Sequence, residues 1–127
     1  MTLMAAENLK AISPLTTGAA QRLFMRLVPR LIDRIHEQGY ECTVGDAYRD
    51  PRVFGELGEH LGYGHARSAH KRRLAIDINL FRDGVYLQKT EDHKPFGEWW
   101  KQQHPLCRSG IDFQDGNHYS LEWDGVK

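Results

Sequence analysis

The stretch "LAIDINLFRDGVYLQ", residues 74–88, decides the fold of this chain, because it reads as two short strands joined by a tight turn. Side chains of a strand point alternately to opposite faces, so residues 74–81 divide into two sets. One face carries Leu74, Ile76, Ile78 and Leu80, and the other carries Ala75, Asp77 and Asn79. Residues 82–84, Arg-Asp-Gly, are typical of a hairpin turn, and residues 85–88 form the predicted return strand.

Upstream of this hairpin, residues 16–39 predict a helix whose apolar side chains recur at four-residue spacing, namely Leu23, Leu27, Leu31 and Ile35. Gly39 is a plausible end of the helix, and Pro29 is expected to kink the helix or split it. Residues 40–46 predict a short strand. Asp50 and Pro51 resemble the cap and first turn of a second helix, which would carry Val53, Phe54, Leu57 and Leu61.

Downstream of the hairpin, a short helix is expected around Phe96, Trp99 and Trp100, ending near Pro105. The last predicted strand is residues 117–123, where Tyr119, Leu121 and Trp123 alternate with His118, Ser120 and Glu122. Helices beside hairpin-linked strands favour an α+β fold with a central antiparallel sheet flanked by helices. The chain of 127 residues is long enough for one core, so a single domain over residues 1–127 is expected.

The composition narrows the class of protein. Hydrophobic residues make up 40% and charged residues 27%, which is ordinary for a globular protein. Seventeen basic and seventeen acidic residues balance, which argues against a nucleic-acid partner. No apolar run approaches the roughly 20 residues that span a bilayer, so no membrane insertion is expected. The first residues lack a signal-peptide pattern, which predicts synthesis in the cytoplasm. Cys42 and Cys107 are predicted to be free thiols, Cys107 in a loop, and the chain is expected to be a monomer.

The alternation places Asp77 on the strand face opposite Ile76 and Ile78, and His118 lies in the same way on the last strand. If the two strands pair, Asp77 and His118 meet on one face, and His70 can reach them from the preceding loop. Two histidines and one carboxylate form a three-ligand zinc set that leaves a fourth position for water. Surface and loop positions are the competing interpretation for a chain with seven histidines.

These residues belong to motifs that occur in a fixed order. Ser68, His70, Ala75 and Asp77 give S-x-H-x-x-x-x-A-x-D, and "DGNHYSLEW", residues 115–123, gives D-x-x-H. The chain thereby resembles the LAS-type zinc peptidases of peptidoglycan over about residues 40–125. This family comprises the D-Ala-D-Ala carboxypeptidases and the L-alanyl-D-glutamate endopeptidases, including small phage endolysins. Arg73 stands where the family usually has glycine.

The resemblance implies one Zn²⁺ per chain, held by His70, Asp77 and His118, in a Hedgehog/D-Ala-D-Ala-peptidase-like fold. It implies Asp115 as general base, and "GDAYRDP", residues 45–51, resembles the segment that presents a catalytic, substrate-binding arginine, here Arg49. Ser68 would orient a ligand or bind substrate. The expected substrate is the peptidoglycan stem peptide, cut at L-Ala–D-Glu or D-Ala–D-Ala, after a factor such as a holin releases the enzyme to the wall.

Simpler interpretations stand beside these roles. Asp115 before Gly116 suits a turn, Arg49 suits a surface ion pair, and Ser68 suits a loop cap. The alternative functions are a non-catalytic zinc-containing cell-wall-binding module of the same fold and, from the "GNH" stretch at 116–118, a metal-dependent nuclease. Five further histidines are not assigned as ligands: His60 and His65 flank the motif in a supporting or solvent-facing role, His36 is expected on an exposed helix face, and His93 and His104 near loop and helix ends.

Overall fold

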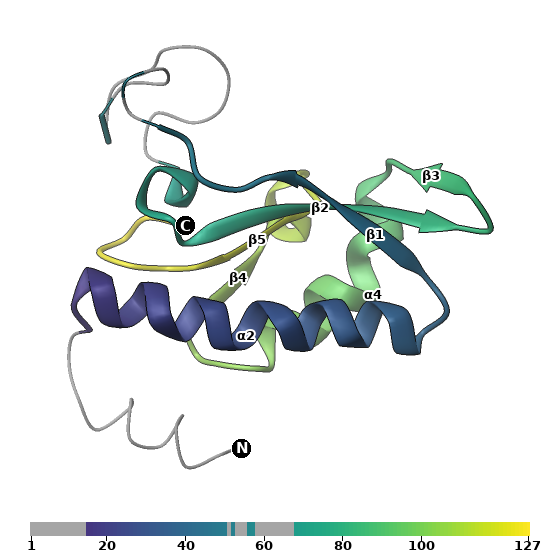
Figure 1. The fold of residues 1–127 in the computed structure, drawn as a ribbon, viewed down its shortest axis with the longest axis horizontal. Coiled ribbons are helices and arrows are strands. Elements are labelled where there is room, and N and C mark those ends of the chain that lie inside the picture. The colour runs from purple at the N-terminus through teal and green to yellow at the C-terminus, as the bar shows by residue number, and fades with distance from the viewer. Residues whose placement is uncertain (1–14, 51, 53–55, 58–67) are drawn as a thin grey trace.

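Strand β2, Ala75–Arg82, is the centre of the fold (Figure 1). In this computed structural model the described residues are 15–50, 52, 56, 57 and 68–127. They form two α-helices and a five-stranded sheet in which every strand pair is antiparallel. The predicted α+β class is therefore confirmed, with the strand order β1-β2-β5-β4 and with β3 also paired to β2.

The two edges of β2 have different partners. Strand β1, Glu41–Asp46, pairs along one edge, opposite residues 77–81. Strand β3, Val85–Leu87, pairs with residues 80–82, and because β1 already occupies that length, β3 must lie on the other edge. Strand β5, His118–Leu121, pairs with residues 75–77 on the same edge as β3. Along this second edge, the partner of β2 therefore changes from β5 at residue 77 to β3 at residue 80.

The predicted hairpin is confirmed. Asp83 and Gly84 both have positive φ, 52° and 79°, which a two-residue turn between antiparallel strands requires. Strand β4, Cys107–Ser109, was not predicted, and the expectation that Cys107 lies in a loop is wrong. Three residues are too few to show an alternating pattern, so only the pairing with β5 defines this strand. Both cysteines are free thiols, as expected.

Helix α2, Thr17–Glu37, begins after Thr16, whose hydroxyl accepts a hydrogen bond from the backbone N–H of Ala19. It runs unbroken through Pro29, so the expected split does not occur. Pro29 has no backbone N–H, so the carbonyl of Met25, four residues earlier, loses its helical hydrogen bond. Both residues are exposed, and water can satisfy that carbonyl. The opposite face buries Leu23, Leu27, Leu31 and Ile35. At about 1.5–3 kcal/mol for each buried apolar side chain, this packing outweighs one missing hydrogen bond.

The core lies between the sheet and two helices, α2 and α4, the latter spanning Thr90–Lys101. Figure 1 shows α2 running along one side of the sheet. Trp100 of α4 joins the layers, because its ring meets Phe24 of α2 and Tyr119 of β5 edge-on, each at 6.1 Å between centroids. Its indole N–H donates to the carbonyl of Ser120 at 3.1 Å. The other face of β2 carries Ala75, Asp77, Asn79 and Phe81.

Two expectations about the fold, the helix after Asp50 and the likeness to a Hedgehog-like fold, stay predictions in part or in whole. The helix expected after Asp50 falls mostly on residues outside the described ones, although the Asp50 carboxylate accepts the Arg52 backbone N–H at 2.8 Å, as a helix cap does. Among the described residues, none of the helices combines the length and the apolar character that a bilayer span needs. The expected likeness to a Hedgehog-like fold remains a prediction.

Candidate metal centre

Strand pairing brings the first two candidate ligands together. Asp77 of β2 is the direct register partner of His118 of β5, as the alternation of both strands predicted. His118 Nδ1 lies 3.7 Å from Asp77 Oδ1. His118 is 4% exposed, and Asp77 is partly buried beside it.

A short 3-10 helix, η1 (Ala69–Arg72), delivers the third candidate ligand, His70. The hydroxyl of Ser68 caps this helix by accepting the backbone N–H of His70 at 3.2 Å. Arg73 ends it in the left-handed conformation, with φ 60° and ψ 34°. Glycine adopts this conformation without a Cβ clash, which explains physically why a glycine would suit this position. Arg73 accepts it here, and its guanidinium lies 4.2 Å above the Tyr48 ring.

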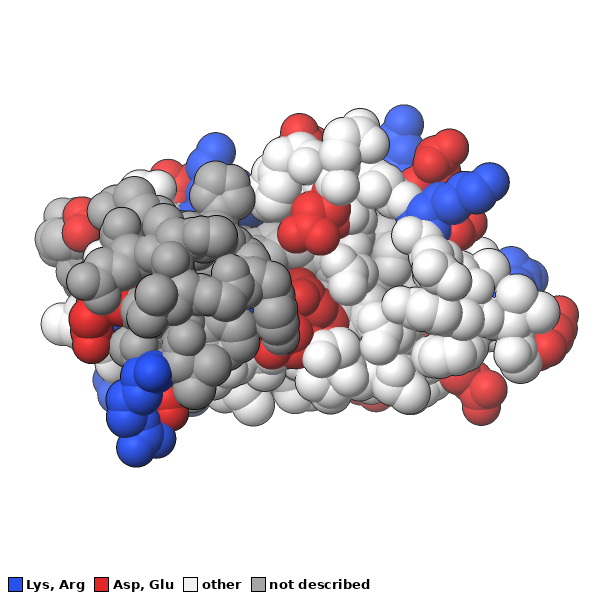
Figure 2. All heavy atoms as spheres, turned by 90° about the horizontal axis from the view of Figure 1, so that it is seen from above, with Lys and Arg blue, Asp and Glu red and all other residues white. Residues whose placement is uncertain are grey.

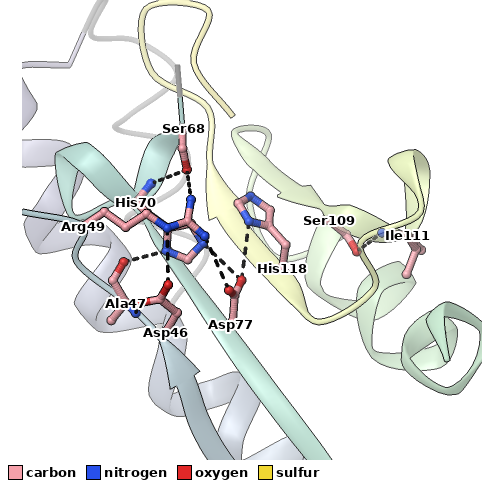
Figure 3. A network of polar contacts seen from close by, with 9 residues as sticks. All are labelled: Asp46, Ala47, Arg49, Ser68, His70, Asp77, Ser109, Ile111 and His118. Carbon is pink, nitrogen blue, oxygen red and sulfur yellow. Dashed lines mark hydrogen bonds and ion pairs between the residues drawn. The ribbon is translucent and has the colours of Figure 1, made fainter. Parts of the chain in front are cut away.

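The three side chains form one cluster, which Figure 3 shows around the carboxylate of Asp77. A donor atom from each of His70, Asp77 and His118 lies within 4.8 Å of the other two. His70 Nε2 is 3.1 Å from Asp77 Oδ1. Two ligands that each stand about 2.0–2.2 Å from one tetrahedral ion are themselves about 3.3–3.5 Å apart, and the 3.1 and 3.7 Å contacts bracket that separation. The group can therefore hold a metal ion.

The protonation of His70 supports this conclusion. Its Nδ1 contacts the carbonyl oxygen of Ala47, which can only accept, so Nδ1 must carry the hydrogen. Nε2 then faces the carboxylate oxygen of Asp77, and a lone pair against a carboxylate is repulsive unless a cation, either a proton or a metal, lies between them. A histidine whose second N–H is donated to a carbonyl is the usual arrangement of a metal-ligating imidazole.

His118 also has capacity for a ligand. Its Nε2 is buried, and no hydrogen-bond partner for it exists within the part of the chain that the structure describes. An unpartnered buried nitrogen costs about 1–3 kcal/mol of desolvation. Nδ1, the other nitrogen of this ring, is the one that faces Asp77, so a metal ion held there would leave Nε2 without a partner. Its ring meets those of His70 and Phe113 edge-on, at 5.1 and 5.5 Å between centroids.

The electrostatics of Asp77 favour the ionised form. Burial by itself raises the pKa of this carboxyl, but hydrogen bonds and positive charge from His118 and His70 outweigh burial and hold the pKa well below its usual range. Arg49 adds a further cation, with its guanidinium nitrogen 3.9 Å from Asp77 Oδ2. The cluster thus presents an anionic oxygen between two imidazoles.

Arg49 and Ser68 lie beside the cluster rather than on the open surface. Arg49 is 7% exposed; it donates to the hydroxyl of Ser68 at 3.0 Å and to Asp46 at 3.3 Å. Arg49 does form an ion pair, with Asp46. It is buried, however, so the interpretation of Arg49 as a surface residue is wrong. Ser68 holds both Arg49 and the backbone of His70, so it positions two functional residues.

Asp115, the expected base, lies outside the donor cluster. It is exposed on the turn before β5, and its carbonyl accepts the backbone N–H of His118 at 2.9 Å. Neighbouring glycines fix this turn: a Cβ at Gly110 would overlap the Asp115 carbonyl, and one at Gly116 would come 2.7 Å from Cα of Thr90 in α4. Asp115 lines a groove together with Asn79 and Asn117.

Three residues around the site were not anticipated as its neighbours. Asp46 could have been noticed from its three-residue spacing to Arg49, whereas the contribution of Ala47 is a backbone carbonyl that no sequence pattern marks. His93 lies in the first turn of α4, near a helix end as expected, but it is 2% exposed and its ring bonds the Tyr119 hydroxyl at 2.8 Å. His36 is exposed on α2, as expected.

No protein-family model matches this chain, and no curated protein matches it. The likeness to zinc peptidases therefore rests on the motifs and on the cluster that they form.

Proposed function

We propose that this chain is a zinc-dependent peptidase that hydrolyses peptide bonds in the stem peptides of peptidoglycan, with the role of a phage or prophage endolysin. The observation that carries the proposal is the convergence of His70, Asp77 and His118, whose donor atoms lie within 4.8 Å of one another. Three protein ligands of this kind are typical of catalytic zinc sites, because structural sites usually use four and favour cysteine. Both cysteines lie outside this group of residues.

The residues divide the chemistry among them. His70, Asp77 and His118 would hold the zinc, which when bound supplies Lewis-acid polarisation and lowers the pKa of water to about 7. Asp115 would accept a proton from the attacking water and return it to the leaving amine as the C–N bond breaks. Arg49, held by Asp46 and Ser68, would offer guanidinium N–H groups to a substrate carboxylate or carbonyl.

Digestion of purified peptidoglycan, followed by mass spectrometry of the released muropeptides, tests the proposal. The zinc-loaded protein should release products whose masses identify one cleaved bond, either L-Ala–D-Glu or D-Ala–D-Ala. Protein treated with a chelator should release none, and zinc should restore the products. A protein that binds zinc and wall fragments without hydrolysis would instead be the wall-binding module, and cleavage of added DNA would favour the nuclease.

A further inference from the structure

A polar groove adjoins the strands that carry two of the candidate metal ligands, Asp77 and His118. Its volume is about 170 Å³, and it lies where the edge of β2 changes partner from β5 to β3. Asn79 follows Asp77 by two residues on the same face of β2, and Asn117 directly precedes His118. The groove is therefore lined by chain neighbours of two candidate ligands, Asp77 and His118, together with Thr90 and His93 of α4.

The chemistry of the groove is that of neutral amides beside one acid. Four residues with amide side chains line it, Asn79, Gln88, Gln114 and Asn117, together with one acidic residue, Asp115. Of the described residues that line the groove, none is a lysine or an arginine. Figure 2, which looks onto this side of the molecule, shows acidic side chains near the middle of the face and basic ones towards its margins.

The amide of Asn79 is held in a fixed orientation. Its Oδ1 accepts from the hydroxyl of Tyr86, and its Nδ2 donates to the hydroxyl of Thr43, each at 3.3 Å. The ring of Tyr86 stacks on Phe81 at 5.2 Å, which holds the hydroxyl in place. A carboxamide carries two donors and two acceptor positions, so Asn79 keeps capacity for a ligand after making both bonds.

We propose that this groove is the subsite that selects the peptide group beside the scissile bond, and that it accepts a carboxamide or an amine and disfavours a carboxylate. The inference rests on the proposed peptidase function and names the specificity of that same site. A carboxamide can pair with the amides and with Asp115. A carboxylate would face Asp115 without a cation from the groove lining, and like charges that close together repel.

The size of the groove agrees with one small polar group. Ligand pockets for drug-sized molecules enclose about 300–1,000 Å³ and are mainly apolar, whereas this groove is smaller and mainly polar. Arg49 follows β1 in the chain, and β1 pairs with the other edge of β2; its guanidinium lies 3.9 Å from Asp77 Oδ2. The cation and the amide groove therefore flank the cluster from opposite edges of β2, and a bound peptide would meet different charges at its two ends.

Two synthetic stem peptides test the assignment, identical except that the α-carboxyl of the D-glutamate is free in one and is a carboxamide in the other. The ratio of their kcat/KM values is measured with the zinc-loaded wild type and with Gln88→Lys and Gln88→Glu. Gln88 is exposed, so neither change should disturb the fold. Gln88→Lys should shift the ratio towards the carboxylate and Gln88→Glu away from it, each roughly 3- to 5-fold, the effect of one exposed ion pair.

Gln102→Lys and Gln102→Glu are the matched controls. Gln102 is exposed at the end of α4 and does not line the groove, and these variants change the net charge by the same amount. They should leave the ratio unchanged. If both peptides are hydrolysed but the ratio of kcat/KM values does not change with the charge at residue 88, the groove assignment is overturned and the peptidase function stands.

Binding is followed separately, by the side-chain amide NMR signals of Asn79 and Asn117 during titration with each peptide. If neither peptide is hydrolysed but the carboxamide peptide perturbs these signals more strongly, the groove stands and the peptidase function fails. If neither hydrolysis nor perturbation is seen with either peptide, the groove assignment fails as well.

Discussion

Two groups of buried histidines in this domain differ in what faces them. His70 and His118 are 1% and 4% exposed, and both turn a ring nitrogen towards the carboxylate of Asp77. His93 is equally buried at 2%, but its Nδ1 meets the neutral hydroxyl of Tyr119. Both groups are packed in the same sheet region, because Tyr119 directly follows His118 on β5.

The difference shows that burial alone does not make a histidine a metal ligand. Around His93, burial holds the pKa down at about 4, against small opposing effects of Asp92 and Asp77, so the imidazole stays neutral and serves packing. Around His70 and His118, an anionic oxygen of Asp77 faces two ring nitrogens. A cation, either a proton or a metal ion, would offset the repulsion among these electron-rich atoms. A carboxylate among the histidines is the feature that separates a candidate site from core structure.

Removal of that carboxylate should produce the largest effect. Asp77→Asn keeps the shape but removes the charge that neutralises the metal, so zinc content should fall from about one per chain to near zero after dialysis, and hydrolysis with it. Elemental analysis and a muropeptide assay measure the two effects. Asp83→Asn is the matched control, because Asp83 is exposed in the hairpin turn at φ 52°, which asparagine also tolerates. Full zinc content in Asp77→Asn would place the metal elsewhere.

A smaller effect, on turnover alone, separates metal binding from proton transfer. Asp115 lies outside the donor cluster, so Asp115→Asn should keep the zinc content, the fold and the affinity for wall fragments. Turnover should fall by roughly 10²–10⁴-fold, because an amide is not basic near neutral pH. Asp124→Asn is the control, an exposed turn aspartate at φ 52°. Near-wild-type turnover in Asp115→Asn would make Asp115 a turn residue and require a different base.

The sequence was sufficient for the cluster because strand alternation is a strict rule. Residues two apart share a face, so Asp77 and His118 had to lie opposite the apolar layers of their own strands, and the pairing of β2 with β5 placed them together. His70 required the spacing of the motif as well, because η1 is a four-residue turn with no periodic pattern of its own. Pattern and motif together therefore predicted all three members.

The sequence did not predict the features of the fold that depend on tertiary contacts. β4 exists because three residues pair with β5, and α2 continues through Pro29 because its buried face is held by the core. The burial of His93 follows from the close approach of α4 to the turn at Gly116, where a Cβ would lie 3.3 Å from Cβ of His93. None of these contacts has a local signature along the chain.

The smallest expected effect concerns His93 and appears as a dependence of stability on pH. Because its pKa is about 4 in the folded state and ordinarily 6.5, the unfolded chain binds more protons between these values. The stabilisation is therefore complete above pH 6.5 and is lost as the pH falls towards 4, by up to about 3 kcal/mol in total. Asp77 contributes only at lower pH, because its ordinary pKa of 3.8 and its still lower pKa in the folded state both lie below this window.

Urea unfolding of metal-free protein at pH values from 7 to 4.5 measures this effect without release of a bound metal ion, and His70 and His118 are present in both proteins that are compared. The comparison is with His93→Asn, whose amide can occupy the position of Nδ1 and keep a hydrogen bond to Tyr119 but does not titrate. The wild type should lose more unfolding free energy on acidification than the variant, and the difference should grow steadily below pH 6.5. Burial also lowers the pKa of His104, but that residue is present in both proteins and its contribution cancels. Parallel curves would mean that His93 binds protons as readily in the folded state as in the unfolded state, and the contrast between a neutral core histidine and the histidines around Asp77 would then fail.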